Sequence, residues 1–198
     1  MKTLMVFAKA PALGRGKTRL AGGNGAAGIG AVHALRLYRA MTVRVLRSVR
    51  DARWKVVVAG TPDGVRAREW GDVEVVAQGA GSLSPRLEAA LSGRGTICVI
   101  GTDCPQVQAR DVADAFAALR TCDVVLGPAD DGGFWLIGAK RVWPGMLEGV
   151  RWSSEHAAAD VAARVERAGG RVGWLRVLVD VDDVEALAVV REMGRRIV

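Results

Sequence analysis

The stretch Asp123-Val-Val-Leu-Gly-Pro-Ala-Asp-Asp-Gly-Gly-Phe-Trp-Leu-Ile-Gly138 joins two short apolar runs through an acidic, glycine-containing turn. The runs at 124–127 and 134–137 are typical of buried strands, and their close spacing favours a hairpin or another antiparallel element. The turn at 130–133 must then lie at an edge of the sheet that meets solvent. Because Asp-Gly is a common hairpin pair, this turn is either a plain loop or part of a metal or polyol site.

Strands and helices are expected to alternate along the rest of the chain. Such alternation specifies an α/β fold, a three-layer sandwich with a mostly parallel mixed sheet. No linker or repeat divides residues 1–198 into more than one domain. The expected strands are 3–8, 55–59, 73–77, 96–100 and 172–179, and the expected helices are 26–49, 62–70, 85–91, 110–119, one capped by Ser153 or Ser154 that reaches Ala168, and a terminal helix after Asp183.

The composition predicts a folded protein that binds an anion. Half of the 198 residues are apolar, and no segment approaches the ~20 apolar residues of a membrane span. The net charge of +7 favours either nucleic acid or phosphorylated small molecules as partners. Nucleic acid is not favoured, because the basic residues are spread over predicted helix faces. Examples are Arg36, Arg39, Arg44, Arg47 and Arg50.

The cysteines indicate a reducing, cytoplasmic location. Cys98, Cys104 and Cys122 are odd in number and lack metal-ligand spacing, so they are expected to be reduced thiols. Cys104 lies in a loop that is expected to hold site residues. Neither histidine is close to it in sequence, so a catalytic thiol is not favoured.

A basic, glycine-containing loop at 9–20 follows the first strand. Gly14 and Gly16 allow a tight backbone turn, and four cationic side chains could wrap a polyphosphate. The loop is not a P-loop, because Pro11 stands where that motif needs glycine. A solvated surface loop is the alternative. The cationic residues are Lys9, Arg15, Lys17 and Arg19.

Carboxylates follow two of the predicted strands. Asp103 ends one of them and is a candidate ligand for Mg²⁺, which typically takes one or two carboxylates together with phosphate oxygens. Asp180 and Asp182 alternate, so on an extended segment they point to one side and could complete the same site. Capping of the terminal helix by Asp182 or Asp183 is an equally good interpretation.

Two further loops are candidates for ligand contacts. Gly79 and Gly81, in the loop at 78–86, would let a planar base or a sugar approach the backbone, and Arg86 could reach a phosphate. The segment at 152–154 precedes a predicted helix N-terminus, which is a ready anion site. A plain glycine loop and a packing role for Trp152 are the alternatives.

Taken together, these segments resemble a bacterial family of glycosyltransferase-like proteins in the nucleotide-diphospho-sugar transferase superfamily. The molybdenum-cofactor guanylyltransferases and the phospholactate guanylyltransferases are similar to it. The matching segments span nearly the whole chain in order. They are Phe7-Ala-Lys-Ala-Pro11, Gly14 with Lys17-Thr-Arg-Leu20, Gln78-Gly-x-Gly81, Gly101-x-Asp-x-Pro105, Leu126-Gly-Pro-Ala-x-Asp-Gly-Gly133, Trp152-Ser153 and Asp180-Val-Asp182.

The resemblance implies a sandwich of the GT-A type, a nucleotide on the first basic loop and a divalent metal, Mg²⁺ or Mn²⁺, near Asp103. Two departures stand out. Ser82-Leu83-Ser84 replaces the Asp-Leu-Gly step that usually follows Gln-Gly-x-Gly, and Trp135 replaces a common tyrosine. The first departure puts specificity, or activity itself, in question.

The leading hypothesis is a metal-dependent transferase that moves a sugar from a nucleotide sugar to a small acceptor. Nucleotidyl transfer from an NTP to a phosphorylated acceptor and non-catalytic nucleotide binding are the alternatives. The predicted catalytic residues are Asp103 and Asp131, with Asp131 as a base near the acceptor. The predicted metal ligands are Asp103, Asp180 and Asp182; the nucleotide-binding residues are Ala8, Lys9, Gly14, Arg15, Lys17, Arg19, Gln78, Gly81 and Arg86; and the acceptor-binding residues are Gly132, Gly133, Trp152 and Ser153.

Overall fold

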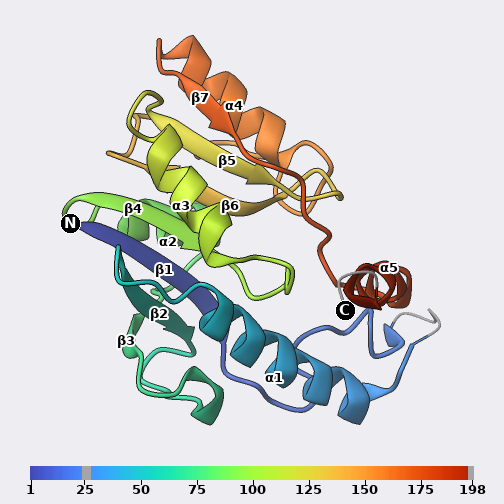
Figure 1. Ribbon diagram of the computed structural model, residues 1–198. Helices are drawn as coiled ribbons and strands as arrows, with labels where there is room; N and C mark the ends of the chain where they lie inside the picture. Colours follow the sequence, from blue (N-terminus) through green and yellow to red (C-terminus); the bar gives the residue numbers. More distant parts are fainter. Residues whose placement is uncertain (24–27, 196–198) are drawn as a thin grey trace.

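A computed structural model describes residues 1–23 and 28–195 and shows a seven-stranded sheet with helices on both faces (Figure 1). The strands are β1 (Lys2–Lys9), β2 (Lys55–Thr61), β3 (Glu74–Ala77), β4 (Thr96–Ile100), β5 (Val124–Pro128), β6 (Phe134–Ala139) and β7 (Val172–Trp174). The helices are α1 (Ala31–Ser48), the 3₁₀ turn η2 (Arg68–Trp70), α2 (Leu83–Leu91), α3 (Ala109–Ala118), α4 (Ala157–Arg167) and α5 (Val184–Arg195).

The strand order explains where a ligand can bind. The sheet runs β3-β2-β1-β4-β6-β5-β7, and β6 is antiparallel to both of its neighbours whereas the other neighbouring pairs are parallel. The mostly parallel sheet and the antiparallel β5–β6 pair are as predicted. After β1 the chain proceeds outward to β2 and β3, and it then returns to β4 on the other side of β1. This reversal opens a crevice beyond the carboxyl ends of β1 and β4, where ligands bind in open α/β sheets.

Alternating side chains of the strands build an apolar layer on each face of the sheet. Leu4 and Val6 of β1 pack in one cluster with Val45 of α1 and Phe116 of α3. The other cluster contains Ile97 and Val99 of β4, with apolar residues of α2 and α4. The predicted three-layer sandwich is therefore confirmed. None of the described helices is both long and apolar enough to cross a bilayer.

A third apolar cluster fastens α5 to the sandwich. Leu187 of α5 packs with Leu20, at the end of the basic loop, with Met41 of α1 and with Val181. Val181 lies between two of the predicted metal ligands. The cluster therefore holds two chain segments of the predicted site in place, although neither belongs to a regular element.

Three predicted helices differ from the structure: one is absent and two begin later than expected. The helix expected at 26–49 begins at Ala31, because Gly30 at φ +79° is not helical; residues 26 and 27 lie outside the described part. The helix expected at 62–70 is wrong. Gly64 has φ +77°, which an α-helix does not accommodate, so only η2 forms there.

The helix expected to start at Ser153 or Ser154 instead starts at Ala157, after His156. Ser153 has a left-handed backbone with φ +58°. The Ser154 hydroxyl donates to the Arg151 carbonyl and accepts from the His156 N–H, so it closes a turn and caps no helix. The strand expected at 172–179 ends at Trp174, and beyond it only Leu178 bridges to Ala129.

Candidate active site

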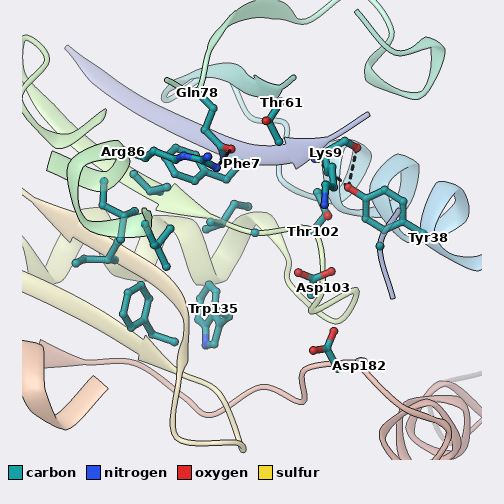
Figure 2. A pocket seen from close by; sticks show the side chains of 18 of the residues that line it. Phe7, Lys9, Tyr38, Thr61, Gln78, Arg86, Thr102, Asp103, Trp135 and Asp182 are labelled. Atoms are coloured by element: carbon teal, nitrogen blue, oxygen red, sulfur yellow. Dashed lines mark hydrogen bonds between the residues drawn. The ribbon is translucent and has the colours of Figure 1, made fainter. Parts of the chain in front are cut away.

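A cavity of about 450 Å³ lies at the reversal of strand order. Its walls come from the carboxyl ends of β1 to β4 and from the start of β6, which reaches the same edge because it is antiparallel. Figure 2 shows Gln78, Thr61 and Arg86 at one end, and Lys9, Thr102, Asp103 and Asp182 at the other. Of the predicted nucleotide-binding residues, Lys9, Lys17, Gln78 and Arg86 line the cavity, whereas Ala8, Gly14, Arg15, Arg19 and Gly81 do not.

The Lys17 ammonium forms ion pairs with all three predicted metal ligands. Its Nζ lies 2.7 Å from Asp103 Oδ1, 2.5 Å from Asp182 Oδ1 and 3.6 Å from Asp180 Oδ1. The side chain is only 4% exposed, and a buried charge persists only where it is paired. The Lys17 backbone has φ +51°, which is rare for a residue with a side chain. Strain of this kind is often found at functional sites.

The charges of the cluster shift the pKa of its members. Burial alone would lower the pKa of Lys17, but Asp103, Asp180 and Asp182 outweigh it and raise that pKa well above its usual range. Burial, together with the charges of Asp103 and Asp182, raises the pKa of Asp180 to about 7 despite the nearby Lys17. Burial also acts on Asp182, but Lys17 and Arg19 prevail and lower its pKa. The nearby Lys17 therefore compensates the buried charge of Asp180 only in part.

Helix capping and site formation are divided between neighbouring aspartates. Asp183 Oδ1 accepts the backbone N–H of Ala186 at 2.9 Å and so caps the start of α5. Asp182 is left free to bind Lys17 and Arg19. Asp183 therefore takes the capping role, and metal coordination by Asp182 stays a prediction.

Tyr38 of α1 fixes the end of β1 beside the cavity (Figure 2). Its hydroxyl accepts the N–H of Lys9 at 3.0 Å and donates to the carbonyl of the same residue at 2.8 Å. Both polar backbone groups of Lys9 are therefore satisfied where the chain leaves the sheet. The basic loop therefore begins at a backbone position that Tyr38 holds in place.

The loop after β3 is held by Asp63. Its Oδ1 accepts the backbone N–H groups of Gln78, at 3.0 Å, and of Gly79, at 3.2 Å. Arg86 reaches back from α2 and donates to Gln78 Oε1 at 3.2 Å. Its Nε is buried and has no hydrogen-bond partner among the described residues. This end of the cavity thus offers a guanidinium beside the apolar walls of Phe7, Leu83 and Leu87.

Residues 42–154 match the model of a family described as "Uncharacterized protein conserved in bacteria (DUF2064)". The chain belongs to this family. Among proteins with curated annotation, none matches the chain.

Solved structures place this DUF2064 chain in the nucleotide-diphospho-sugar transferase fold, as predicted. A provisionally named nucleotide-diphospho-sugar transferase from Desulfovibrio desulfuricans is 26% identical, with a TM-score of 0.84 over 96% of this chain and 85% of that one. Molybdopterin-guanine dinucleotide biosynthesis protein A from Archaeoglobus fulgidus is 15% identical, with a TM-score of 0.56 over 99% and 100% of the two chains. The 2-C-methyl-D-erythritol 4-phosphate cytidylyltransferase from Thermus thermophilus is 18% identical, with a TM-score of 0.54 over 98% and 100%. The first and third of these neighbours are named as transferases, in agreement with the prediction of an enzyme.

The acidic turn of the DUF2064 chain packs on the segment of Asp180 but does not line the cavity. Asp130 Oδ1 accepts the N–H of Asp180 at 3.0 Å, while Asp131 Oδ1 accepts the N–H of Gly133 at 2.9 Å within the turn. Gly132 has φ +83°, and a Cβ there would lie 2.1 Å from the Glu155 carbonyl oxygen. The backbone of this turn therefore has a structural role, and the ligand contacts of residues 131–133 stay a prediction.

Trp152 and Ser153 also lie outside the lining of the cavity. The Trp152 ring meets Phe134 edge-on at 5.9 Å between centroids, and its Nε1 donates to Ser84 Oγ at 2.9 Å. Ser84 Oγ in turn donates to the Leu147 carbonyl. Trp152 therefore supports the wall that Phe134 presents to the cavity, which is the packing alternative considered for it.

The thiol of Cys104 is buried behind the site. Burial, reinforced by Asp180 and Asp103, raises its pKa far above the usual range. A thiol in this environment stays protonated and is a poor nucleophile. All three cysteines are free, as predicted.

The three carboxylates have the chemistry of a divalent-metal site. One oxygen from each of Asp103, Asp180 and Asp182 lies within 4.8 Å of the others. Asp180 Oδ1 is buried with no hydrogen-bond partner among the described residues, and Asp103 and Asp180 also line a small cavity of about 50 Å³. Oxygen donors of this kind suit Mg²⁺ or Mn²⁺. The residues therefore fit such an ion, provided that the Lys17 ammonium moves.

Sequence reasoning missed several residues of the site. Tyr38 lies on a helix whose apolar spacing predicts only burial. Asp63 follows a proline in a segment that was expected to be helical, although Asp63-Gly64 is itself a turn pair. The apolar run that contains Phe134 and Trp135 predicts only a strand, but both residues line the cavity because β6 starts at its edge.

Proposed function

We propose that this chain is a divalent-metal-dependent transferase that acts on an activated nucleotide and moves a sugar from a nucleotide sugar to a small acceptor. The observation that supports this most is the meeting of Lys17, Asp103 and Asp182 at the wall of one cavity. The cavity volume of about 450 Å³ lies within the range of small-molecule sites, roughly 300–1,000 Å³.

Lys9 and Lys17 bind the diphosphate of the donor in this proposal. Both line the cavity, and their ammonium groups oppose the charge of phosphate oxygens. Arg19 assists by neutralising Asp182, and Arg15 contributes to the basic field of the loop. Gln78 and Arg86, at the other end, orient the rest of the donor. A divalent cation held by Asp103, Asp180 and Asp182 would neutralise the charge of the leaving diphosphate.

Asp131 is proposed as the base that takes the proton of the acceptor hydroxyl. Its side chain is exposed, and its charge acts on Asp180. The acceptor would then lie between the acidic turn and the cavity, near Gly132, Gly133, Trp152 and Ser153.

Nucleotidyl transfer is the second candidate. The basic loop has four cationic side chains, which suit a triphosphate as well as a diphosphate. The donor would then be an NTP and the acceptor a phosphorylated small molecule. A third candidate is nucleotide binding without catalysis. Ser82 stands where the family usually has an aspartate, and its side chain makes no capping hydrogen bond to α2. The loss of that aspartate is the reason to consider this third candidate.

Product analysis separates these three candidates. The protein is incubated with Mg²⁺, a panel of small-molecule acceptors and either nucleotide sugars or NTPs, and the released nucleotide or pyrophosphate is identified. Release of NDP from a nucleotide sugar supports glycosyl transfer, whereas release of pyrophosphate from an NTP supports nucleotidyl transfer. Binding of nucleotide with no turnover across acceptors would contradict both enzymatic proposals.

A further inference from the structure

The position of the Lys17 ammonium has a consequence for metal binding. Nζ lies 2.5 Å from Asp182, 2.7 Å from Asp103 and 3.6 Å from Asp180. A Mg²⁺ ion bound by the same oxygens would lie roughly 2.1 Å from each of them, in the space that Nζ fills. The ammonium and a divalent cation therefore exclude each other, both sterically and by charge repulsion.

A displaced Lys17 needs another anion. Its side chain is 4% exposed, and an unpaired ammonium in such a place is strongly unfavourable. Lys17 lines the cavity beside Lys9, where the phosphates of a nucleotide are proposed to bind. A phosphate oxygen there would accept the ammonium as it leaves the carboxylates.

We infer that Lys17 acts as an exchangeable internal cation that couples the two ligands: it occupies the carboxylate site until nucleotide phosphate draws it away and a divalent cation takes its place. This inference rests on the proposed function. It assigns to Lys17 a positioning role beyond phosphate binding, because each ligand then favours the binding of the other. In the protein alone, binding of the metal is opposed by the lysine.

The test compares Mn²⁺ binding to the unmodified protein and to Lys17→Met, in the absence of nucleotide, by calorimetry and by the EPR signal of free Mn²⁺. Removal of the competing ammonium should tighten Mn²⁺ binding about tenfold or more, since charge-assisted hydrogen bonds to two carboxylates no longer have to be broken. The same variant should bind nucleoside diphosphate more weakly. Lys9→Met is the matched control for the Mn²⁺ measurement without nucleotide, because Lys9 lines the same cavity but has no ion pair among the described contacts.

The possible results distinguish a failure of the exchange between the Lys17 ammonium and the metal from a failure of the proposed function. Mn²⁺ affinity that is unchanged or weaker in Lys17→Met overturns the exchange, as does an equal gain in Lys9→Met, which would indicate only a general effect of charge. In either case, metal-dependent nucleotide binding by the unmodified protein would leave the proposed function standing.

A second measurement needs no variant at Lys17. A ¹⁵N-labelled lysine ammonium held in ion pairs gives a resolvable NMR signal. The Lys17 signal should change when Mg²⁺ and a nucleoside diphosphate are added together at saturating concentrations. A Lys17 signal that stays the same under those conditions would overturn the exchange even if Lys17→Met failed to fold.

Discussion

Lys9 is the residue at which the chain leaves the sheet and enters the basic loop, and its backbone depends on one side chain. The Tyr38 hydroxyl bonds to both the N–H and the C=O of Lys9. Backbone groups buried without partners are costly. The placement of the cationic loop thus depends on a tyrosine of α1 that is distant in sequence.

The pKa of Tyr38 tests this arrangement directly, because the chain contains one tyrosine. Burial is the main cause that raises the pKa of Tyr38 above its ordinary value of 10.0. Absorbance at 295 nm should therefore show ionisation at higher pH in the folded protein than in urea. Since the raised pKa favours the protonated native state, its contribution to stability is full below the unfolded-state pKa and is lost as the pH rises through the folded one.

Tyr38→Phe is the control for that titration, since it should remove the pH-dependent rise in absorbance at 295 nm and leave only the constant absorbance of the tryptophans. It should also destabilise the fold by about 1–3 kcal/mol, because two polar groups of Lys9 lose their partner. An identical midpoint in folded and unfolded protein would contradict the buried position of the hydroxyl.

For single residues, the sequence predicted which charged side chains meet at the site better than it predicted the contacts that hold them there. Lys17, Asp103 and Asp182 were expected to meet because each follows a strand or a turn at one sheet edge, and they do. Tyr38 could not be identified, because its helical spacing indicates burial and says nothing of a hydroxyl bonded to β1.

At the scale of the elements, a side chain of β6 packs closely against one glycine of β5. A Cβ on Gly127 would lie 2.4 Å from Cε2 of Trp135, so the indole rests directly on the β5 backbone. The same indole lines the cavity, and its Nε1 donates to the Arg176 carbonyl at 3.0 Å. Gly127 is therefore what allows Trp135 to form part of the cavity wall.

Gly127→Ala should destabilise the protein by about 1–3 kcal/mol, the usual effect of overpacking a rigid core, and should shift the fluorescence of Trp135. Chemical denaturation measures the first effect. Gly194→Ala is a matched control in α5, where a Cβ has nothing within 4 Å. It should be neutral or stabilising by about 0.5–1 kcal/mol. Equal effects of the two substitutions would contradict the close contact.

The helices that were predicted wrongly share one cause, a left-handed backbone residue, which the spacing of apolar residues does not reveal. Gly64 and Ser153 adopt positive φ values within segments whose composition suits a helix. The sequence predicts helix starts at Pro62 and at Ser153 or Ser154, but the local backbone turns the chain instead. Strands with long apolar runs, such as β1 and β4, were located nearly to the residue because nothing competes with their pattern.

Across the whole molecule, the apolar cluster around α5 joins segments that are distant in sequence. Leu187 contacts the cluster that contains Leu20 and Val181, so one helix buttresses both the cationic loop and the acidic segment. Alternation of strands and helices predicted the layers. It could not predict that the terminal helix packs beside α1 (Figure 1), because no local pattern specifies which surface a last helix covers.

Leu187→Ala should lower the free energy of unfolding by about 2–5 kcal/mol and also weaken nucleotide binding at temperatures where the protein is still folded. Leu119→Ala, in the cluster that contains Phe116 and outside the lining of the cavity, is the control. It should cost similar stability with less effect on binding. If both variants bind nucleotide equally well, α5 does not position the site.

The most direct test of the shared metal and nucleotide site is the shift in melting temperature caused by a nucleoside diphosphate, measured with and without Mg²⁺. Ligand binding stabilises the folded state by mass action, by about 2.7 kcal/mol at a hundredfold excess over Kd. The unmodified protein and the exposed control Asp72→Ala should both show a larger shift with Mg²⁺, whereas Asp103→Ala should lose the part that depends on Mg²⁺. A full Mg²⁺-dependent shift in Asp103→Ala would contradict the account.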